Sequence, residues 1–191
     1  MSTERTDEEL VTDFKEAAEG DKIAFETLVE RHRTRVMANC RYISGSQADA
    51  EDLAQEVFVK AYFGLERFEG RASFKTWIQR IKVNHCLNHV RKRAGKSFVE
   101  IEDLELKGAE ELQVAPKAEK NVAALGMRER IDEALEGLTD TLRIPLVMRD
   151  MDHLPYQEIA DTLGIGLSAV KMRIKRARAE FQKRYTALEE G

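Results

Sequence analysis

The sequence is poor in the residues that interrupt helices. Its 191 residues include 3 prolines and 11 glycines, and runs that alternate apolar with polar residues are few. Prolines and glycines punctuate turns and alternation marks strands, so this composition argues against an all-β or loop-rich fold. The length suits one mid-sized domain or two small ones. We therefore expect an all-α protein.

Cysteines and long apolar runs are also scarce. Cys40 and Cys86 form no CxxC pair, which favours two reduced thiols in a cytoplasmic protein. The charged N-terminus MSTERTDEEL is unlike a signal peptide. No apolar run approaches the roughly 20 residues of a transmembrane helix. We expect a cytoplasmic location and no insertion into a membrane.

The chain lacks an overall positive charge. Its formal net charge is −4, so any surface that binds nucleic acid must be local. Such a region is present near the C-terminus, in the stretch YQEIADTLGIGLSAVKMRIKRARAEF, which spans residues 156–181. Its second half is crowded with lysine and arginine, although the whole chain is acidic.

This stretch predicts two short helices joined at Gly164, where a left-handed residue can turn the chain. Ser168 is placed to cap the second helix. Apolar residues of that helix share one face: Val170, Ile174, Ala177 and Phe181. A glycine turn, an apolar inner face and a basic outer face are typical of a helix-turn-helix that enters the DNA major groove. The alternative is a solvated basic face on an ordinary helix.

A change in composition divides the chain. Residues 97–126 are rich in acidic residues and poor in large apolar ones, which predicts a flexible linker. Helical spacing of apolar residues predicts helices on both sides of it. We expect two small helical domains, at 1–96 and 127–191.

Two stretches resemble conserved regions of bacterial sigma factors of the sigma-70 family. The stretch that resembles the second region consists of DAEDLAQEVFVKAYFGLERF, a glycine loop and SFKTWIQRIKVNHCLNHVRKR. The stretch that resembles the fourth region is LRIPLVMRDMDHLPYQEIADTLGIGLSAVKMRIKRARAEF. Their order and short linker are similar to the extracytoplasmic-function (ECF) subgroup. The resemblance implies an alternative sigma factor that binds core RNA polymerase, recognises −35 and −10 promoter elements and helps to open the DNA.

In this family a helix of the second region docks on a coiled coil of the polymerase β′ subunit. The matching helix here is 49–65, whose mixed carboxylates and apolar residues suit an interface. The candidate docking residues are Asp49, Asp52, Gln55, Glu56 and Phe58. The alternative is an acidic helix that faces solvent.

In the family, the loop matching 68–76 and the following helix open the −10 element and hold a flipped base. Aromatic stacking, worth about 1–3 kcal/mol per base, and nearby polar groups suit that task. The candidate −10 contacts are Phe68, Gly70, Arg71, Ser73, Phe74, Trp77, Arg80, Asn84, Asn88 and Arg91. For Trp77 we favour a core position, and we count Lys82 among the cations for phosphates.

The family's recognition helix reads the −35 element. The matching candidates are Arg149, Ser168, Lys171, Met172, Lys175, Arg176 and Arg178. The resemblance also implies contact with the polymerase β flap. It further implies an anti-sigma factor, often membrane-anchored in this family, that holds the protein inactive. The acidic linker would thread through the polymerase or serve only as a tether.

Two other functions fit parts of the sequence. A stand-alone helix-turn-helix regulator would use its N-terminal module to sense or dimerise, but such a module does not need the pattern of 49–93. A metal-dependent hydrolase could use His85 and His89, which are four residues apart on a helix. No third ligand is evident nearby, and we expect no metal, no cofactor and no catalytic residue.

Overall fold

The computed structural model describes residues 5–17, 22–94 and 126–190, and every regular element in these ranges is helical. The expected all-α fold is therefore confirmed. The chain divides into two compact units, Met1–Val90 and Arg91–Gly191. The acidic segment 97–126 lies outside the described residues except for Gly126. None of the described helices has both the length and the hydropathy of a membrane span.

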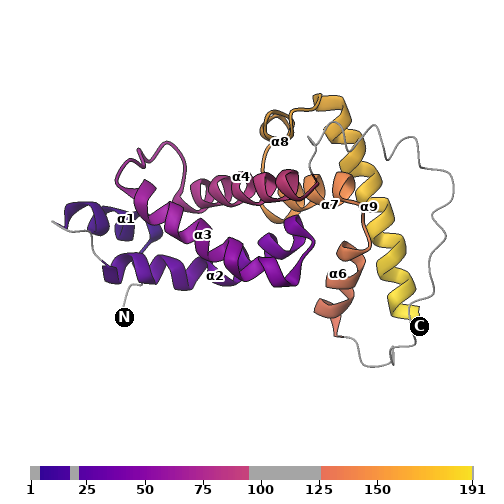
Figure 1. The fold of residues 1–191 in the computed structure, drawn as a ribbon, viewed down its shortest axis with the longest axis horizontal. Helices are drawn as coiled ribbons and strands as arrows, with labels where there is room; N and C mark the ends of the chain where they lie inside the picture. Colours follow the sequence, from indigo (N-terminus) through magenta and orange to yellow (C-terminus); the bar gives the residue numbers. More distant parts are fainter. Residues whose placement is uncertain (1–4, 18–21, 95–125, 191) are drawn as a thin grey trace. The chain divides into compact units, whose positions relative to one another are not determined.

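The first unit contains four helices (Figure 1, indigo to magenta). They are α1 (Asp7–Glu16), α2 (Lys22–Ser44), α3 (Gln47–Leu65) and α4 (Phe74–Ala94), the last of which continues past the unit boundary. A capping box starts α1, because the Thr6 hydroxyl accepts from the Glu9 N–H and the Glu9 carboxylate accepts from the Thr6 N–H. Ser46 caps α3 by accepting from the Asp49 N–H.

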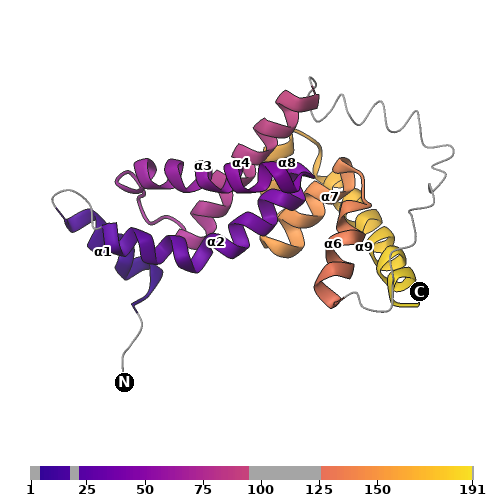
Figure 2. The same ribbon diagram turned by 60° about the horizontal axis from the view of Figure 1, so that its bottom comes forward.

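Aromatic rings fill the core between α1, α2 and α3. Phe14 lies 5.9 Å from Phe25 and 5.4 Å from Tyr62, measured between ring centroids. Tyr62 also packs edge-on against Phe25 at 5.1 Å. Such edge-to-face contacts are favoured by the ring quadrupoles and add to the burial of apolar area. They fix α1 against the helix pair α2 and α3, which lie side by side (Figure 2).

The second unit is built from shorter helices that pack on one long helix. The elements are α6 (Met127–Glu136), α7 (Asp140–Leu146), the π-helix η2 (Val147–Met151), α8 (Tyr156–Leu163) and α9 (Leu167–Glu190). Helices α6, α7 and α8 each pack against α9. The unit core is aliphatic, with Ile144, Met148, Ile159 and Ile174 almost fully buried.

Pro145 lies inside α7, and the chain passes from an α-helix to a π-helix directly after it. Proline has no N–H to donate to the carbonyl four residues earlier, so a regular α-helical ladder is interrupted there. The next turn closes with a bond from the Asp152 N–H to the Val147 oxygen at 3.1 Å. The sequence predicts a kink or delay at Pro145, and the structure shows a change of helix type after it.

The turn between α8 and α9 has the predicted left-handed glycine. Gly164 has φ of 73° and donates its N–H to the Ala160 oxygen at 2.9 Å. The position of Ser168 differs from the prediction. Helix α9 already begins at Leu167, so Ser168 is its second residue and does not stand at the cap position.

Candidate nucleic-acid interface

Helix α9 has an exposed polar stripe and a buried apolar one. The exposed residues share the spacing i, i+3, i+4, i+7 and i+8, and we call them the recognition face: Ser168, Lys171, Met172, Lys175 and Arg176. The opposite stripe is buried through Val170, Ile174 and Ala177, as the sequence predicts. Phe181, at its end, is half-buried. The buried stripe therefore turns the basic residues outward.

Two arginines expected near the −35 element are held by their own domain. Arg178 donates from Nε to Asp150 Oδ2 at 2.8 Å and from Nη2 to Asp150 Oδ1 at 2.5 Å. These bonds to the carboxylate raise the pKa of Arg178. Arg149 donates to the Leu154 oxygen at 2.9 Å, and its guanidinium lies 4.6 Å from the Tyr156 ring centroid. Arg178 follows Lys171 by seven residues on the same exposed side of α9, but its guanidinium is paired with Asp150.

Helix α4 also presents a polar stripe. Arg80, Asn84 and Asn88 are four residues apart and exposed. They follow an exposed loop tip with Gly70 and Arg71, in which Gly70 has φ of 70° and Arg71 pairs with Glu69. Ser73 ends the loop, and its hydroxyl accepts from the Thr76 N–H at 3.2 Å. We call the exposed set the strand face: Gly70, Arg71, Ser73, Arg80, Asn84 and Asn88.

The aromatic residues of this loop lie inside the unit. Phe74 is fully buried, Phe68 is nearly so, and Trp77 is half-buried. The ring centroids of Phe68 and Phe74 lie 4.9 Å and 5.8 Å from that of Trp77. Gly64 makes room for the indole, since a Cβ there would lie 3.1 Å from it. The expectation that Phe68 and Phe74 stack on a base is corrected here, because neither ring has an open face.

Two cations on α4 do not belong to the strand face. Lys82 is fully buried and donates to the Gln79 side chain, so its predicted role at phosphates does not fit this position. Its aliphatic stem replaces apolar core volume, and its ammonium is satisfied inside. Arg91 lies in the last turn of α4 and is half-buried, next to the exposed Lys92 and Arg93.

The two histidines of α4 face α3. His85 Nε2 lies 2.9 Å from Glu56 Oε2, and His89 Nε2 lies 3.2 Å from Asp49 Oδ2. Burial lowers the pKa of His85 more than the nearby Glu56 carboxylate raises it. These pairs tie α3 to α4, and Asp49 is thus occupied within the unit. Within the described ranges no group of three metal-ligating side chains is found.

Helix α3 presents the residues expected to dock, with one correction. Asp52, Gln55 and Glu56 are exposed, but Phe58 is 9% exposed and belongs to the core. Sequence reasoning missed two exposed apolar side chains on the same stripe, Val59 at 54% and Phe63 at 75% exposure. Both lie on the same side of the helix as Gln55, at i+4 and i+8 from it, so helical spacing would have found them. We call this set the docking face: Asp52, Gln55, Glu56, Val59 and Phe63.

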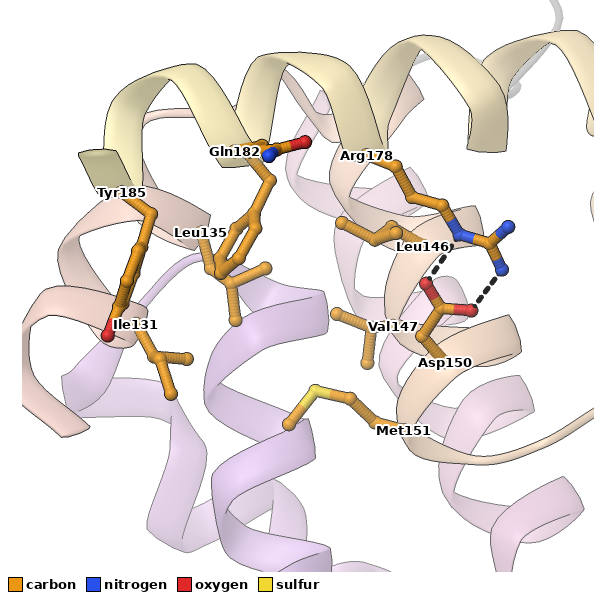
Figure 3. Close-up of a pocket in the computed structure, with 10 residues that line it drawn as sticks. Ile131, Leu135, Leu146, Val147, Asp150, Met151, Arg178, Gln182 and Tyr185 are labelled. Carbon is orange, nitrogen blue, oxygen red and sulfur yellow. Dashed lines mark hydrogen bonds and ion pairs between the residues drawn. The ribbon is translucent and has the colours of Figure 1, made fainter. Parts of the chain in front are cut away.

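The second unit has an apolar groove of about 390 Å³ at the C-terminal half of α9. Its apolar walls are formed by Ile131, Leu135, Leu146, Val147, Met151, Phe181 and Tyr185. Figure 3 shows Arg178 reaching from α9 to Asp150 at one side of it. Helix α9 therefore serves two surfaces, with basic residues in its first half and apolar ones toward its end.

Comparison with known proteins identifies the family. Residues 28–96 match Sigma-70 region 2, and residues 128–181 match Sigma-70, region 4. The ECF RNA polymerase sigma-E factor of Escherichia coli (strain K12) is 31% identical over 195 residues, covering 98% of each chain. This chain belongs to the ECF group of the sigma-70 family. The protein is therefore a sigma factor that directs promoter-specific transcription initiation, and it is not an enzyme.

Solved structures share the fold of this chain. The structure of CnrH, in complex with the cytosolic domain of CnrY, is 26% identical to this sigma factor. Its TM-score is 0.55, covering 93% of this chain and 96% of CnrH. The sigma factor RpoE, in complex with the anti-sigma factor NepR from Bartonella quintana, has a TM-score of 0.58 at 23% identity. That match covers 85% of this chain and 96% of RpoE, and it supports the fold.

Proposed function

We propose that this sigma factor engages polymerase and promoter through the exposed stripes of three helices. The observation that carries the proposal is that α3, α4 and α9 each have one exposed stripe opposite a buried one. The exposed side chains differ in chemistry from one helix to the next. The domains would divide the work as predicted, with 1–96 docking on polymerase and reading the −10 element. Residues 127–191 would read the −35 element, and 97–126 would link the two.

The docking face would bind the coiled coil of the polymerase β′ subunit. Its carboxylates and amide lie next to Val59 and Phe63 on the same stripe, and such a combination of apolar and polar side chains is typical of protein interfaces. An exposed phenylalanine at 75% gains much more apolar burial on binding than the buried Phe58 can. Phe63 is therefore the main apolar anchor of this contact.

The strand face would contact the opened −10 element. Asn84 and Asn88 present amides that can both donate to and accept from base edges, and Arg80 and Arg71 supply positive charge. Phe68, Phe74 and Trp77 would shape the loop from beneath. Single-strand binding that depends on amides and loop shape needs fewer phosphate contacts than duplex binding does.

The recognition face would enter the major groove of the −35 element. Lys171, Lys175 and Arg176 lie on one exposed stripe of α9, where cations can reach phosphates or guanine edges. Met172, 63% exposed, offers an apolar contact such as a thymine methyl group accepts. The fact that the whole chain has a net charge of −4 favours specific binding only within the assembled polymerase.

The apolar groove of the second unit would receive an apolar segment of the polymerase β flap. Its wall is nearly all apolar, and it lies along the C-terminal half of α9, whereas the recognition face lies on the N-terminal half. Binding there would leave Lys171 and Lys175 available for DNA.

An anti-sigma factor would compete for these surfaces. Support comes from the structures of CnrH and RpoE, each determined with a bound protein partner. A partner that covers the docking face or the apolar groove would block polymerase while the factor remains in the cytoplasm. Binding of a purified partner should then be displaced by core polymerase, and simultaneous binding of both would contradict this proposal.

The decisive experiment is transcription in vitro with core polymerase free of other sigma factors and DNA from the same source. Transcript 5′ ends that share two upstream motifs would support the proposal, and no starts above core-only background would contradict it.

The docking face is tested by Phe63→Ser. We expect about tenfold weaker binding to core polymerase, since truncating a residue that anchors an interface costs more than about 1 kcal/mol. Ile23→Ser is the matched control, because Ile23 is similarly exposed, at 68%, on another helix.

Tight sequence-specific binding by the chain alone, without polymerase, would instead favour a stand-alone regulator. A gel shift on the same promoter fragment, with and without core polymerase, separates the two functions.

A further inference from the structure

Helix α1 contacts the loop that precedes α4. Lys15, near the C-terminal end of α1, donates from Nζ to the backbone oxygen of Phe68. The same ammonium lies 5.9 Å from the centroid of the Phe68 ring. A charged donor therefore holds both the backbone and the ring of one loop residue. These residues are 53 positions apart in sequence, so the contact depends on tertiary structure.

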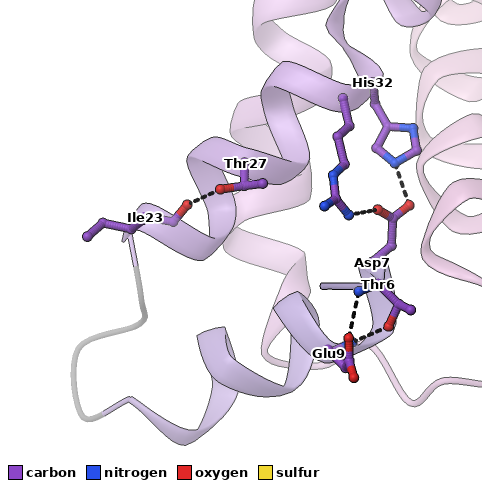
Figure 4. Close-up of polar contacts among 7 residues, drawn as sticks. Thr6, Asp7, Glu9, Ile23, Thr27 and His32 are labelled. Carbon is purple, nitrogen blue, oxygen red and sulfur yellow. Dashed lines mark hydrogen bonds and ion pairs between the residues drawn. The ribbon is translucent and has the colours of Figure 1, made fainter. Parts of the chain in front are cut away.

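The N-terminal end of α1 is linked, through α2, to the residue that follows the same loop. Asp7 Oδ2 lies 2.7 Å from His32 Nε2, and Arg31 donates to Asp7 Oδ1 at 3.0 Å. Figure 4 shows the His32 ring and the Asp7 carboxylate pointing toward one another. The His32 ring packs 5.3 Å from that of Phe74, the first residue of α4. Helix α1 is thus linked to the beginning of the loop directly and to its end through α2.

The segment between these two points carries the exposed tip of the strand face. Phe68 covers Trp77 with ring centroids 4.9 Å apart, and Gly70 turns the chain at φ of 70°. A glycine at the tip permits this turn but adds freedom to the unrestrained chain. The bond from Lys15 to Phe68 therefore restrains the loop two residues before its most permissive position.

We propose that Lys15 is a positioning residue for −10 recognition: it holds Phe68, and through Phe68 the loop that presents Gly70, Arg71 and Ser73 to the opened strand. Lys15 itself does not touch DNA. The inference rests on the proposed role of the strand face, and it adds α1 to the parts of the chain that determine how well the −10 element is bound.

The first test reads the loop without DNA. Trp77 is the single tryptophan of the chain, and Phe68 covers it, so its quenching by acrylamide reports whether the loop stays in place. Lys15→Met should raise the quenching constant by about twofold by loosening the loop locally. In Lys15→Arg the quenching constant should stay close to that of the wild-type protein, since arginine keeps the charged donor. An unchanged constant in Lys15→Met would overturn the proposal.

The control is Arg5→Gln, which removes an exposed ion pair between Arg5 Nη1, just before α1, and Asp13 Oδ2 on that helix at 2.7 Å. It should leave Trp77 quenching unchanged. If Lys15→Met and Arg5→Gln raise quenching equally, Lys15 merely stabilises α1 and has no specific positioning role.

The second test uses the assembled polymerase and a forked DNA with a single-stranded −10 element. Lys15→Met should bind it about 3- to 10-fold more weakly, a loss similar to the net contribution of one typical intramolecular hydrogen bond. Binding to core polymerase and to a −35 duplex should not change. Loosened Trp77 with full −10 binding would overturn the positioning role. Failure of the wild-type factor to bind the forked DNA would instead contradict the proposed function, while Trp77 quenching would still decide whether Lys15 holds the loop.

Discussion

The two helices that carry the candidate DNA contacts, α4 and α9, are similar in length but differ in the side chains that they expose. The exposed stripe of α9 has three cations within six residues, whereas that of α4 has two asparagines and one arginine. Cations at helical spacing suit the dense phosphates of a duplex, while amides suit the edges of unpaired bases. The difference indicates that the chemistry of each stripe follows the form of DNA that it meets.

The buried stripes differ as well. That of α9 includes Val170, Ile174 and Ala177 together with one buried cation, Arg173, whereas α4 buries Gln79 and Lys82 along with apolar residues. A buried ammonium is tolerated only when it is hydrogen-bonded, and in α4 the Gln79 side chain accepts from Lys82 one turn away on the same helix.

The largest expected effect comes from the buried stripe of α9. Ile174→Ala should destabilise the second unit by about 2–5 kcal/mol, because it removes three methyl or methylene carbons from a fully buried site. Its neighbour Lys175→Ala should change stability by less than about 0.5 kcal/mol. Urea unfolding followed by circular dichroism measures both. Equal destabilisation would show that the exposed stripe of α9 contributes as much to stability as the buried one.

A smaller effect should distinguish the two exposed stripes. Lys175→Ala should weaken binding of the holoenzyme to a −35 duplex by about tenfold and reduce the slope of log affinity against log salt by about 1. Asn84→Ala should leave that slope unchanged and weaken binding to the opened −10 strand. Filter binding at several salt concentrations measures both. A salt slope that falls in Asn84→Ala would remove the contrast between the stripes.

The left-handed glycines give a matched pair of variants. Gly70→Ala and Gly164→Ala should each cost about 1 kcal/mol, because both residues have positive φ. A Cβ at either site meets no atom within 4 Å, so the cost comes from the backbone alone. Gly70→Asn and Gly164→Asn should cost less, since asparagine tolerates this conformation. Thermal unfolding compares the four variants, and only Gly70→Ala should also weaken binding to the −10 strand.

The smallest expected effect is a dependence of the first unit on pH. Burial lowers the pKa of His85 below its ordinary value of 6.5, so the folded unit favours the neutral ring. The unfolded chain then binds more protons near and below that value, and stability must fall as the pH drops through it. Urea midpoints from Trp77 fluorescence at about pH 8 and about pH 5.5 test this. In His85→Gln the difference should shrink, and an unchanged difference would assign it to another group.

Local patterns predicted much of the fold. The capping box at Thr6 and Glu9, the glycine turn at 164 and the buried stripe of α9 depend on residues a few positions apart, and all three are present. The resemblance to the family also indicated the face of α3 that carries Asp52, Gln55 and Glu56. Sequence reasoning missed Phe63 because an apolar residue near the end of an amphipathic helix is usually buried.

Residue type alone did not predict which side chains are available to ligands. Arg178 and Lys82 are cations on helices expected to bind DNA, yet one is held by Asp150 and the other by Gln79. Phe74 has the ring that a base could stack on, but the ring is buried beside His32. In each case the partner is distant in sequence or is fixed by helix rotation, which a linear pattern does not specify.

The sequence by itself determined the helical class, the helix-turn-helix and the family, because these depend on local spacing and on motifs carried in order along the chain. Only the tertiary structure decided that Lys15 reaches Phe68 and that Val59 and Phe63 stay exposed on α3. The physical reason is that burial and hydrogen bonding between distant segments depend on how the helices pack, and packing is a property of the folded unit as a whole.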